Sequence, residues 1–323
     1  MSTRTETTLP NPTFGRNYYK SVSDKSLFAK NIDEISFDSI SIEKKKDIYI
    51  FQDRFDSAES KAEFLSQLSD RQFYYRQNGY VIERGLIETE LLDELASLRQ
   101  TLKLGAHGKF PDYTPYVDYE VLKKICCSEK LHSILCELHG EHMGVRFNLS
   151  PLASTERGWH QDAYLDDEYS IPRCAAWIAL DNVPIDCGPF EYVPGSHRWN
   201  TLSRSKVNSV IKEELRWPKN HPNWATISEA FVDPACIKEI KKKQSEIKPF
   251  LAEKGDVLIW HGRLLYRGAP PIDKKAIRPG LITHYASVIE ITNKNRNGNF
   301  MRYGKSGGYY WLPESKSVDF NSQ

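Results

Sequence analysis

The chain has 323 residues, and its 44 Lys and Arg nearly balance its 43 Asp and Glu, which gives a formal net charge of +1. A protein that follows the phosphates of a nucleic acid needs a strongly basic face, so this balance argues against a nucleic-acid partner. Hydrophobic residues make up 40% of the chain and aromatic residues 12%, which is enough for a large core and excludes wholesale disorder.

Features that would place the chain in or across a membrane are missing from the sequence. It has no apolar run of about 18 residues, and its first twenty residues are polar, so we expect neither a membrane span nor a secretory signal. The six cysteines form no Cys-X-X-Cys pair, and two of them, Cys126 and Cys127, are neighbours. This pattern favours reduced thiols over a disulfide framework, so we expect a cytoplasmic protein.

The first half of the chain shows helical patterns after an N-terminal extension, residues 1–65. Ser69 is a capping residue before an aromatic helical stretch, and Gly79 follows as a stop signal. A strand is expected over 80–84. Apolar residues then recur at helical spacing over 87–103, and a further helical region lies between 113 and 140.

The second half of the chain is rich in short apolar runs bounded by Gly, Pro and Asp, which are typical of strands. These runs cover residues 144–150, 174–181, 190–193, 256–260 and 280–288. The pattern predicts a mainly β fold with flanking helices, of the sandwich, jelly-roll or barrel type. We expect one domain over 66–290 and a C-terminal tail over 291–323.

A long insertion, residues 199–253, separates two of the expected strands. Its lysine-rich part, residues 238–248, predicts a solvated helix face rather than an anion site. Because long insertions between strands often become lids, we expect a lid here. The candidate substrate contacts within it, chosen by position alone, are Trp199, Arg216, Trp217 and Trp224.

The strongest chemical signal is the His160-Gln-Asp162 triplet. A spacing of two sends both side chains to the same face of a strand, where an imidazole and a carboxylate can chelate one metal. Two such ligands and a distant histidine make the facial triad of non-haem iron(II) oxygenases, which leaves positions open for a cosubstrate and dioxygen. Alone, the triplet is weak evidence, because chance supplies it often.

Several further motifs follow in a fixed order. They are the aromatic helix and Gly-Tyr-Val strand near Gly79, the His160-Asp162 pair, the strand 177–181, Gly188-Pro189, the segment Pro194-Gly-Ser-His197, Gly255-Asp256 and Arg278. In this combination the chain resembles the phytanoyl-CoA dioxygenase family of iron(II)- and 2-oxoglutarate-dependent oxygenases, over residues 69–289.

The resemblance implies a double-stranded β-helix, which is a jelly-roll or cupin-like barrel. It also implies that His160 and Asp162 bind iron and that Arg278 holds the far carboxylate of 2-oxoglutarate. A guanidinium suits that role because its fork of donors matches a carboxylate and stays charged. We also expect Asn148 and Trp177 to face the barrel interior and contact the cosubstrate. His197 belongs to a tight turn and is not an expected ligand.

The chain departs from the family at the third ligand, a histidine whose place is taken by Tyr266. One hypothesis is that Tyr266 binds iron as a phenolate, since a bound cation favours the ionised form. Another is that His261 replaces the missing histidine ligand. It lies five residues before position 266, so on a regular strand its side chain points to the opposite face, unless a bulge at Gly262 reverses this. His284 lies further along its strand, where we expect it to be beyond the metal. A third hypothesis is a degenerate site.

The resulting prediction is a 2-oxoglutarate-dependent oxygenase that hydroxylates a small molecule, with Tyr266 in the third ligand position and His261 as its alternative. The competing prediction is an inactive barrel-fold protein that binds a small metabolite or regulates another protein. These two differ in whether the protein binds iron(II) and 2-oxoglutarate together. The sequence does not identify the substrate.

Overall fold

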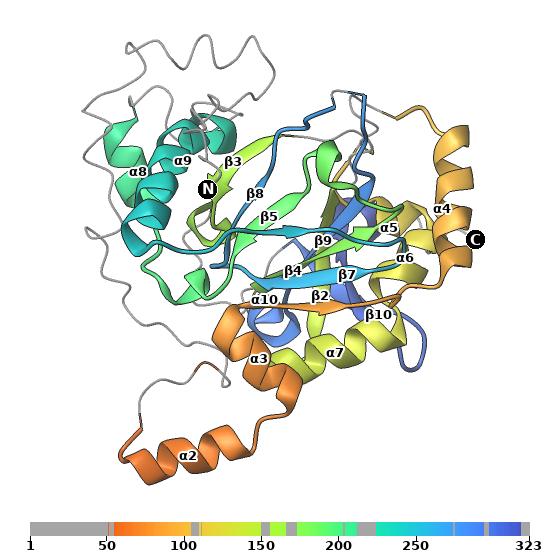
Figure 1. The fold of residues 1–323 in the computed structure, drawn as a ribbon. Helices are drawn as coiled ribbons and strands as arrows, with labels where there is room; N and C mark the ends of the chain where they lie inside the picture. The colour runs from red at the N-terminus through yellow and green to blue at the C-terminus, as the bar shows by residue number, and fades with distance from the viewer. Residues whose placement is uncertain are drawn as a thin grey trace.

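The computed structural model describes residues 51, 55–104, 110, 112–149, 156–165, 173–202, 204–211, 224–273, 275–293 and 297–317. Figure 1 shows two β-sheets in the middle of the molecule, with one group of helices around α4 to α7 and a separate pair, α8 and α9, at the other end. The mainly β fold with flanking helices is therefore confirmed.

The first half of the chain forms helices, of which the one between Ser69 and Gly79 begins and ends where the local signals predict. They and the one strand among them are α2 (Ala58–Ser66), α3 (Asp70–Asn78), β1 (Tyr80–Glu83), α4 (Thr89–Thr101), α5 (Pro115–Asp118), α6 (Glu120–Cys126) and α7 (Glu129–His139). The Ser69 side chain accepts a hydrogen bond from the backbone of Gln72 at the start of α3. Gly79 ends the helix with a φ of 77°, in the left-handed region that favours glycine.

The strands form a seven-stranded sheet and a four-stranded sheet. In spatial order the first contains β1, β7 (Val257–His261), β4 (Arg173–Ala179), β9 (Gly280–Ser287), β2 (Met143–Leu149), β11 (Tyr309–Pro313) and β10 (Gly298–Arg302). The second contains β3 (Arg157–His160), β8 (Leu265–Gly268), β5 (Phe190–Val193) and β6 (Lys248–Phe250).

The remaining helices complete the described fold. These are η6 (Asp162–Leu165), η7 (Ile185–Cys187), η8 (Ser196–Arg198), α8 (Arg204–Val210), α9 (Trp224–Lys243), α10 (Val288–Thr292) and α11 (Glu314–Ser317). Residues 298–313, expected within a C-terminal tail, instead add two strands to the large sheet, where β11 runs parallel to β2. The expected division into extension, domain and tail stays a prediction.

The two faces of the large sheet have different neighbours, because side chains alternate along each strand. Ala176, Ile178 and Ile259 belong to the core shared with the helices α3 to α7. Trp177, Leu258 and Trp260 belong to a second core with the four-stranded sheet, which also contains Phe190 and Tyr266. We call the space between the sheets the inner core and the other face the helix side.

A bulge in β2 exchanges these two faces partway along the strand. Val145 is paired with Tyr285 and belongs to the helix side, but the register shifts before Phe147, which is paired with His284. The shift reverses the alternation, so that Phe147 stacks on His284 with ring centroids 4.2 Å apart. Asn148 consequently lies on the helix side.

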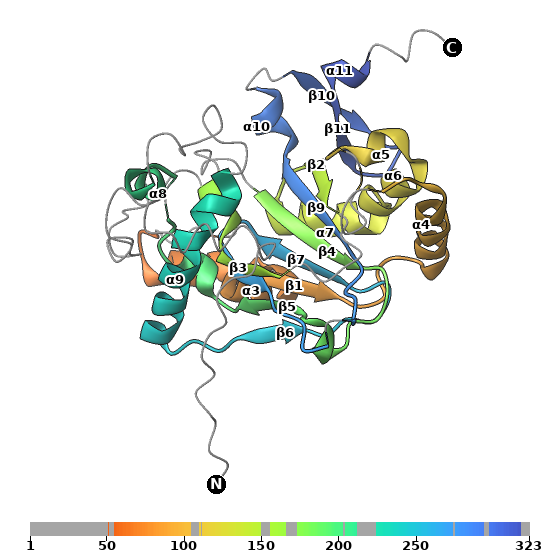
Figure 2. The same cartoon turned by 90° about the horizontal axis from the view of Figure 1, so that it is seen from above.

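The insertion contributes α8 and α9, whose buried residues form a third core with Trp159, Tyr164 and Val193. Figure 2 shows α9 alongside β3. Its lysines 238 and 241–243 are exposed, which confirms the expected solvated face. Among the helices described, none combines the length and the apolar character needed to cross a membrane.

Candidate metal and cosubstrate site

Three of the predicted site residues meet in the inner core. His160 ends β3 directly opposite Tyr266 of β8, and the two rings are 4.3 Å apart between centroids. Asp162 follows two residues later, with its Oδ1 3.9 Å from Nε2 of His160. The expected strand geometry of the pair is wrong, because the strand stops at His160 and Asp162 opens the η6 turn. The side chains nevertheless converge.

The His160 ring is completely buried and held in one orientation. Its Nδ1 lies 2.8 Å from the carbonyl oxygen of Gly158, which is an acceptor, so Nδ1 carries the proton and donates. Nε2 then presents its lone pair, and it has no hydrogen-bond partner among the described residues. Burial and the nearby Arg157 guanidinium hold the pKa of His160 well below its ordinary value. The ring is therefore neutral, as a metal ligand must be.

The Asp162 carboxylate accepts a hydrogen bond on each oxygen. The hydroxyl of Tyr266 donates to Oδ1 at 2.7 Å, and the indole N–H of Trp260 donates to Oδ2 at 3.2 Å. Burial, and then the Asp162 charge, raise the pKa of Tyr266 well above its ordinary value, so the phenol is protonated. These contacts fix the carboxylate beside His160.

Two acidic residues that the sequence patterns did not reveal support the strand that carries His160. Glu229 and Asp233 are one turn apart on α9 and accept from consecutive backbone N–H groups, Glu229 from Gly158 and Asp233 from Trp159 at 2.6 Å. A side chain at Gly158 would collide with Asp233, because an added Cβ would lie 2.8 Å from its Cγ. Their four-residue spacing was the available signal, but nothing in the sequence showed what they bind.

Arg278 is buried, 6% exposed, in the segment that precedes β9. Its Nη1 donates to the carbonyl oxygen of Gly188, two residues before Phe190. The Phe190 ring stacks on Tyr266 with centroids 4.8 Å apart, so this arginine borders the strand that packs against the candidate ligands. Burial lowers the pKa of Arg278 to about 10, which leaves the guanidinium charged near neutral pH.

The two other expected cosubstrate contacts lie on opposite faces of the large sheet. Trp177 faces the inner core, as expected, and its ring lies 5.7 Å from that of Phe250. Asn148 does not face the interior, because the bulge in β2 turns it toward the helices. There its Nδ2 donates to Oγ1 of Thr283 at 2.9 Å and contacts Sγ of Cys126 at 3.5 Å.

The structure separates the other candidate histidines. His261 lies on the helix side, where its ring is 4.9 Å from that of Phe51 and 5.7 Å from that of His197. It is therefore not brought to His160, since no bulge at Gly262 reverses the face of β7. His197 contacts the Arg76 carbonyl oxygen through Nε2 at 3.1 Å and joins η8 to the end of α3.

The position of His284 relative to the metal stays a prediction. Its ring is on the inner-core face, 6.3 Å from that of Trp260 between centroids. Burial lowers the pKa of His284, and the Asp162 carboxylate partly opposes this effect. The structure therefore adds His284 to the titratable groups that surround Asp162.

The structure places two of the four candidate substrate contacts in the insertion, Trp224 and Trp199. Trp224 is buried, stacks under Arg204 at 3.9 Å, and donates from its indole to Oδ1 of Asn208 at 2.7 Å. It is a core residue of the insertion. Trp199 is partly buried beneath Lys243. Arg216 and Trp217 lie outside the described residues.

Comparison with models of protein families gives a match over part of the chain. Residues 124–272 match the model of the family described as phytanoyl-CoA dioxygenase, which confirms the predicted resemblance. The matched segment includes the His160 pair and Tyr266. The cofactors of this family are iron(II) and 2-oxoglutarate, as expected. No curated protein sequence matches the chain.

Solved structures with a similar fold include two of EctD from S. alaskensis, one of them with bound Fe. Each has a TM-score of 0.52 and 15% identity, and the match covers 76% of this chain and 82–83% of the EctD chain. The other EctD structure contains 2-oxoglutarate and 5-hydroxyectoine. The α-ketoglutarate-dependent carbocyclase SnoK from nogalamycin biosynthesis covers 76% of this chain and 98% of its own at 17% identity and a TM-score of 0.49. At these identities EctD shows a shared fold, the double-stranded β-helix.

Proposed function

We propose that this chain, whose residues 124–272 match the phytanoyl-CoA dioxygenase family, is an iron(II)- and 2-oxoglutarate-dependent oxygenase that hydroxylates a small molecule. The observation that carries the proposal is the position of the unpartnered Nε2 of His160, 3.9 Å from Oδ1 of Asp162. A neutral imidazole and a carboxylate at this separation are two of the three protein ligands of a facial triad.

The donor set fits iron(II). Nε2 of His160 offers a lone pair because the Gly158 carbonyl oxygen holds the proton on the other nitrogen. Asp162 offers a carboxylate oriented by Tyr266 and Trp260. With iron(II) and 2-oxoglutarate bound, dioxygen would be the oxidant, and the protein would supply ligands, orientation and a dry surrounding. The aromatic inner core, with Trp260, Phe190 and Tyr266, limits the access of water to the pair.

Tyr266 is the third protein ligand in this proposal. It occupies the family's histidine position, and its hydroxyl is 2.7 Å from Asp162, within reach of a cation held by that carboxylate. Burial keeps the phenol protonated without metal, so binding a cation at the phenol oxygen releases that proton. A hard anionic oxygen favours iron(III) over iron(II), so we expect slower turnover than with a histidine.

Arg278 is the anchor for the distal carboxylate of 2-oxoglutarate. It is buried, and its guanidinium is a planar fork of donors whose geometry matches a carboxylate. Its hydrogen bond to Gly188 fixes one side of the guanidinium, which orients the fork of donors. A carboxylate bound there would offset the charge of the guanidinium.

The first experiment asks whether iron(II) and 2-oxoglutarate bind together. Purified protein is mixed anaerobically with both, and the weak visible charge-transfer band of such chelates is recorded. We expect a band in the wild type and none in His160→Ala, and 2-oxoglutarate should raise the melting temperature only when iron is present. Absence of the band together with no thermal effect would favour the inactive binding protein.

The second experiment identifies the third ligand with three variants. If Tyr266 binds iron, the iron(III) form of the wild type shows a phenolate-to-iron charge-transfer band that Tyr266→Phe lacks, while His284→Ala retains it. Tyr266→His restores the histidine of the family and should bind iron(II) more tightly than the wild type. Unchanged iron affinity and succinate formation in both Tyr266 variants would show that Tyr266 is not at the metal.

A further inference from the structure

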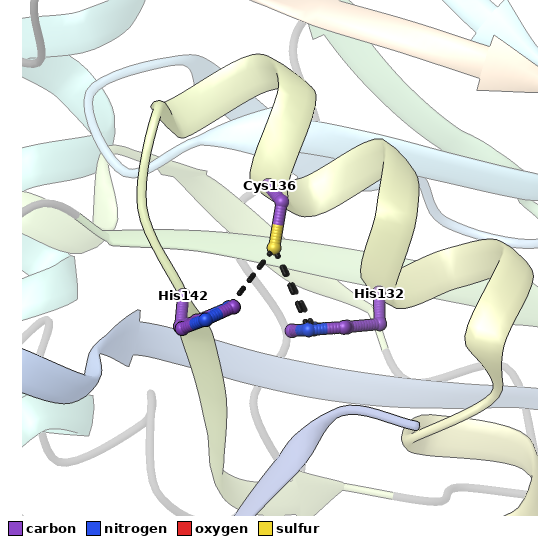
Figure 3. A group of neighbouring side chains, drawn as sticks. All are labelled: His132, Cys136 and His142. Carbon is purple, nitrogen blue, oxygen red and sulfur yellow. Dashed lines mark hydrogen bonds between the residues drawn. The ribbon is translucent and has the colours of Figure 1, made fainter. Parts of the chain in front are cut away.

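A second group of potential metal ligands lies away from the candidate iron site and shares no residue with it. His132, Cys136 and His142 each offer one ligand atom, and these atoms are all within 4.8 Å of one another. Figure 3 shows the two imidazole rings beneath the sulfur of Cys136. The rings stack, with centroids 5.2 Å apart and planes 19° apart.

Local structure explains why these side chains converge. His132 and Cys136 are four residues apart on α7 and therefore share one face of the helix. Gly140 ends α7 in the left-handed conformation and reverses the chain. His142 then stands directly before β2, with its Nδ1 3.4 Å from Sγ of Cys136, and Nε2 of His132 is 3.5 Å from the same sulfur.

These separations match the geometry of a tetrahedral zinc ion. Zinc binds histidine nitrogen at about 2.0–2.1 Å and cysteine sulfur at about 2.3 Å, so adjacent ligand atoms of a tetrahedron lie about 3.6 Å apart. We propose that His132, Cys136 and His142 form a second metal site that takes Zn²⁺ or a cation of similar softness. Three protein ligands leave the fourth position for water, and binding releases the thiol proton of Cys136.

The surroundings of the site are suited to a bound ion. The backbone N–H of Met143 donates to the sulfur of Cys136, and His142 is exposed, which gives the ion a path from solvent. The Tyr309 ring lies 5.8 Å from His132 and 5.0 Å from His142 between centroids. Arg302 is the nearby cation, but it is exposed, so solvent screens its repulsion of the metal.

A metal here would connect three parts of the fold. His132 and Cys136 belong to α7, and His142 leads into β2, where its carbonyl oxygen accepts from Val288 after β9 at 2.9 Å. Tyr309 begins β11 and packs on both imidazoles. The ion would therefore fasten the helical layer to the large sheet at β2 and β11, a structural role separate from oxygenase chemistry.

Cobalt(II) is the probe, because a thiolate ligand gives a near-ultraviolet charge-transfer band that the iron site cannot produce, as its ligands include no sulfur. We expect the band to saturate at one equivalent of Co²⁺ and Zn²⁺ to remove it by displacement, while Mg²⁺ does not. Cys136→Ser should abolish the band, and His142→Gln, a change at an exposed position, should weaken Co²⁺ binding by about 100-fold or more.

Two control variants separate this site from other cysteines and from the iron site. Cys236→Ala removes a buried thiol on α9 and should keep the band, as should His160→Ala combined with Asp162→Ala. If no band forms, or if it persists unchanged in both Cys136→Ser and His142→Gln, the proposal is overturned. If Cys136→Ser does not fold, the His142→Gln titration decides alone, and failure of the iron experiments leaves this result unaffected.

Discussion

The two candidate metal sites are built in opposite ways. At the candidate iron site, Tyr266 and Asp162 meet although they are 104 positions apart in the chain, and Asp162 also contacts Trp260 of the inner core between the two sheets. At the second site, Cys136 and His142 are 6 residues apart, and a single helix end brings them together beside solvent. The first site exists only when the whole sandwich is formed, whereas the second requires one helix and the turn that follows it.

The largest expected effect is on succinate formation when Asp162 is removed, a change that should leave the second metal site intact. Asp162→Ala deletes a proposed ligand and the acceptor for both Tyr266 and Trp260, so we expect 2-oxoglutarate-dependent succinate formation to fall about 100-fold or more. The cobalt–thiolate band should be unchanged. Asp181→Ala, which removes an exposed acid after β4, is the control. Normal iron binding by Asp162→Ala would contradict the proposed ligand set.

A smaller effect concerns the acid that holds β3. Burial raises the pKa of Glu229 from 4.5 to about 7, and the Arg157 guanidinium only partly opposes this. A raised folded-state pKa means that the stabilising contribution is complete below pH 4.5 and is lost as the pH rises through about 7. Over this interval the free energy of unfolding should fall by about 3 kcal/mol more in the wild type than in Glu229→Gln.

Urea unfolding at a series of pH values between 4 and 8 measures this difference, with the secondary structure followed by circular dichroism. The variant also loses the ion pair with Arg157, so its stability at any single pH is less informative than the slope. Parallel curves for the two proteins would mean that folding leaves the pKa of Glu229 at its ordinary value, as expected if solvent reaches the carboxyl. The iron site would then be less enclosed than its contacts indicate.

The smallest effect tests the close contact between β3 and α9. Gly158→Ala places a methyl group against Asp233, and overpacking of this kind costs about 1–3 kcal/mol. Thermal unfolding should show a lower melting temperature. Gly262→Ala is the matched control, because the nearest atom to an added Cβ there is 3.5 Å away, an ordinary contact. Equal melting temperatures for the two variants would mean that α9 moves away from β3 without cost, and that the contact between them is not tight.

Sequence patterns predicted the elements whose signals are local. Ser69 and Gly79 bound α3 as expected, and the run 190–193 coincides with β5. The His160 pair was also found, although a turn rather than a strand brings Asp162 into place. These correct predictions depend on helix capping and on the alternation of apolar residues along a strand, which a few neighbouring residues determine.

The failures depend on contacts between distant segments. One extra residue in β2 moves Asn148 to the other face, and no signal in the sequence marks that bulge. The N–H groups that Glu229 and Asp233 bind belong to residues 71 and 74 positions away. The place of His284 on the inner-core face, with its ring 6.3 Å from that of Trp260 between centroids, likewise depends on a neighbouring strand.

The position of β3 at one border of the four-stranded sheet has a consequence for protein engineering. Outer strands invite pairing with other molecules unless something covers them, and here a helix of the insertion occupies the backbone groups. Shortening that insertion to admit bulkier substrates would strip this cover. The altered protein would then be prone to self-association through the very segment that bears His160.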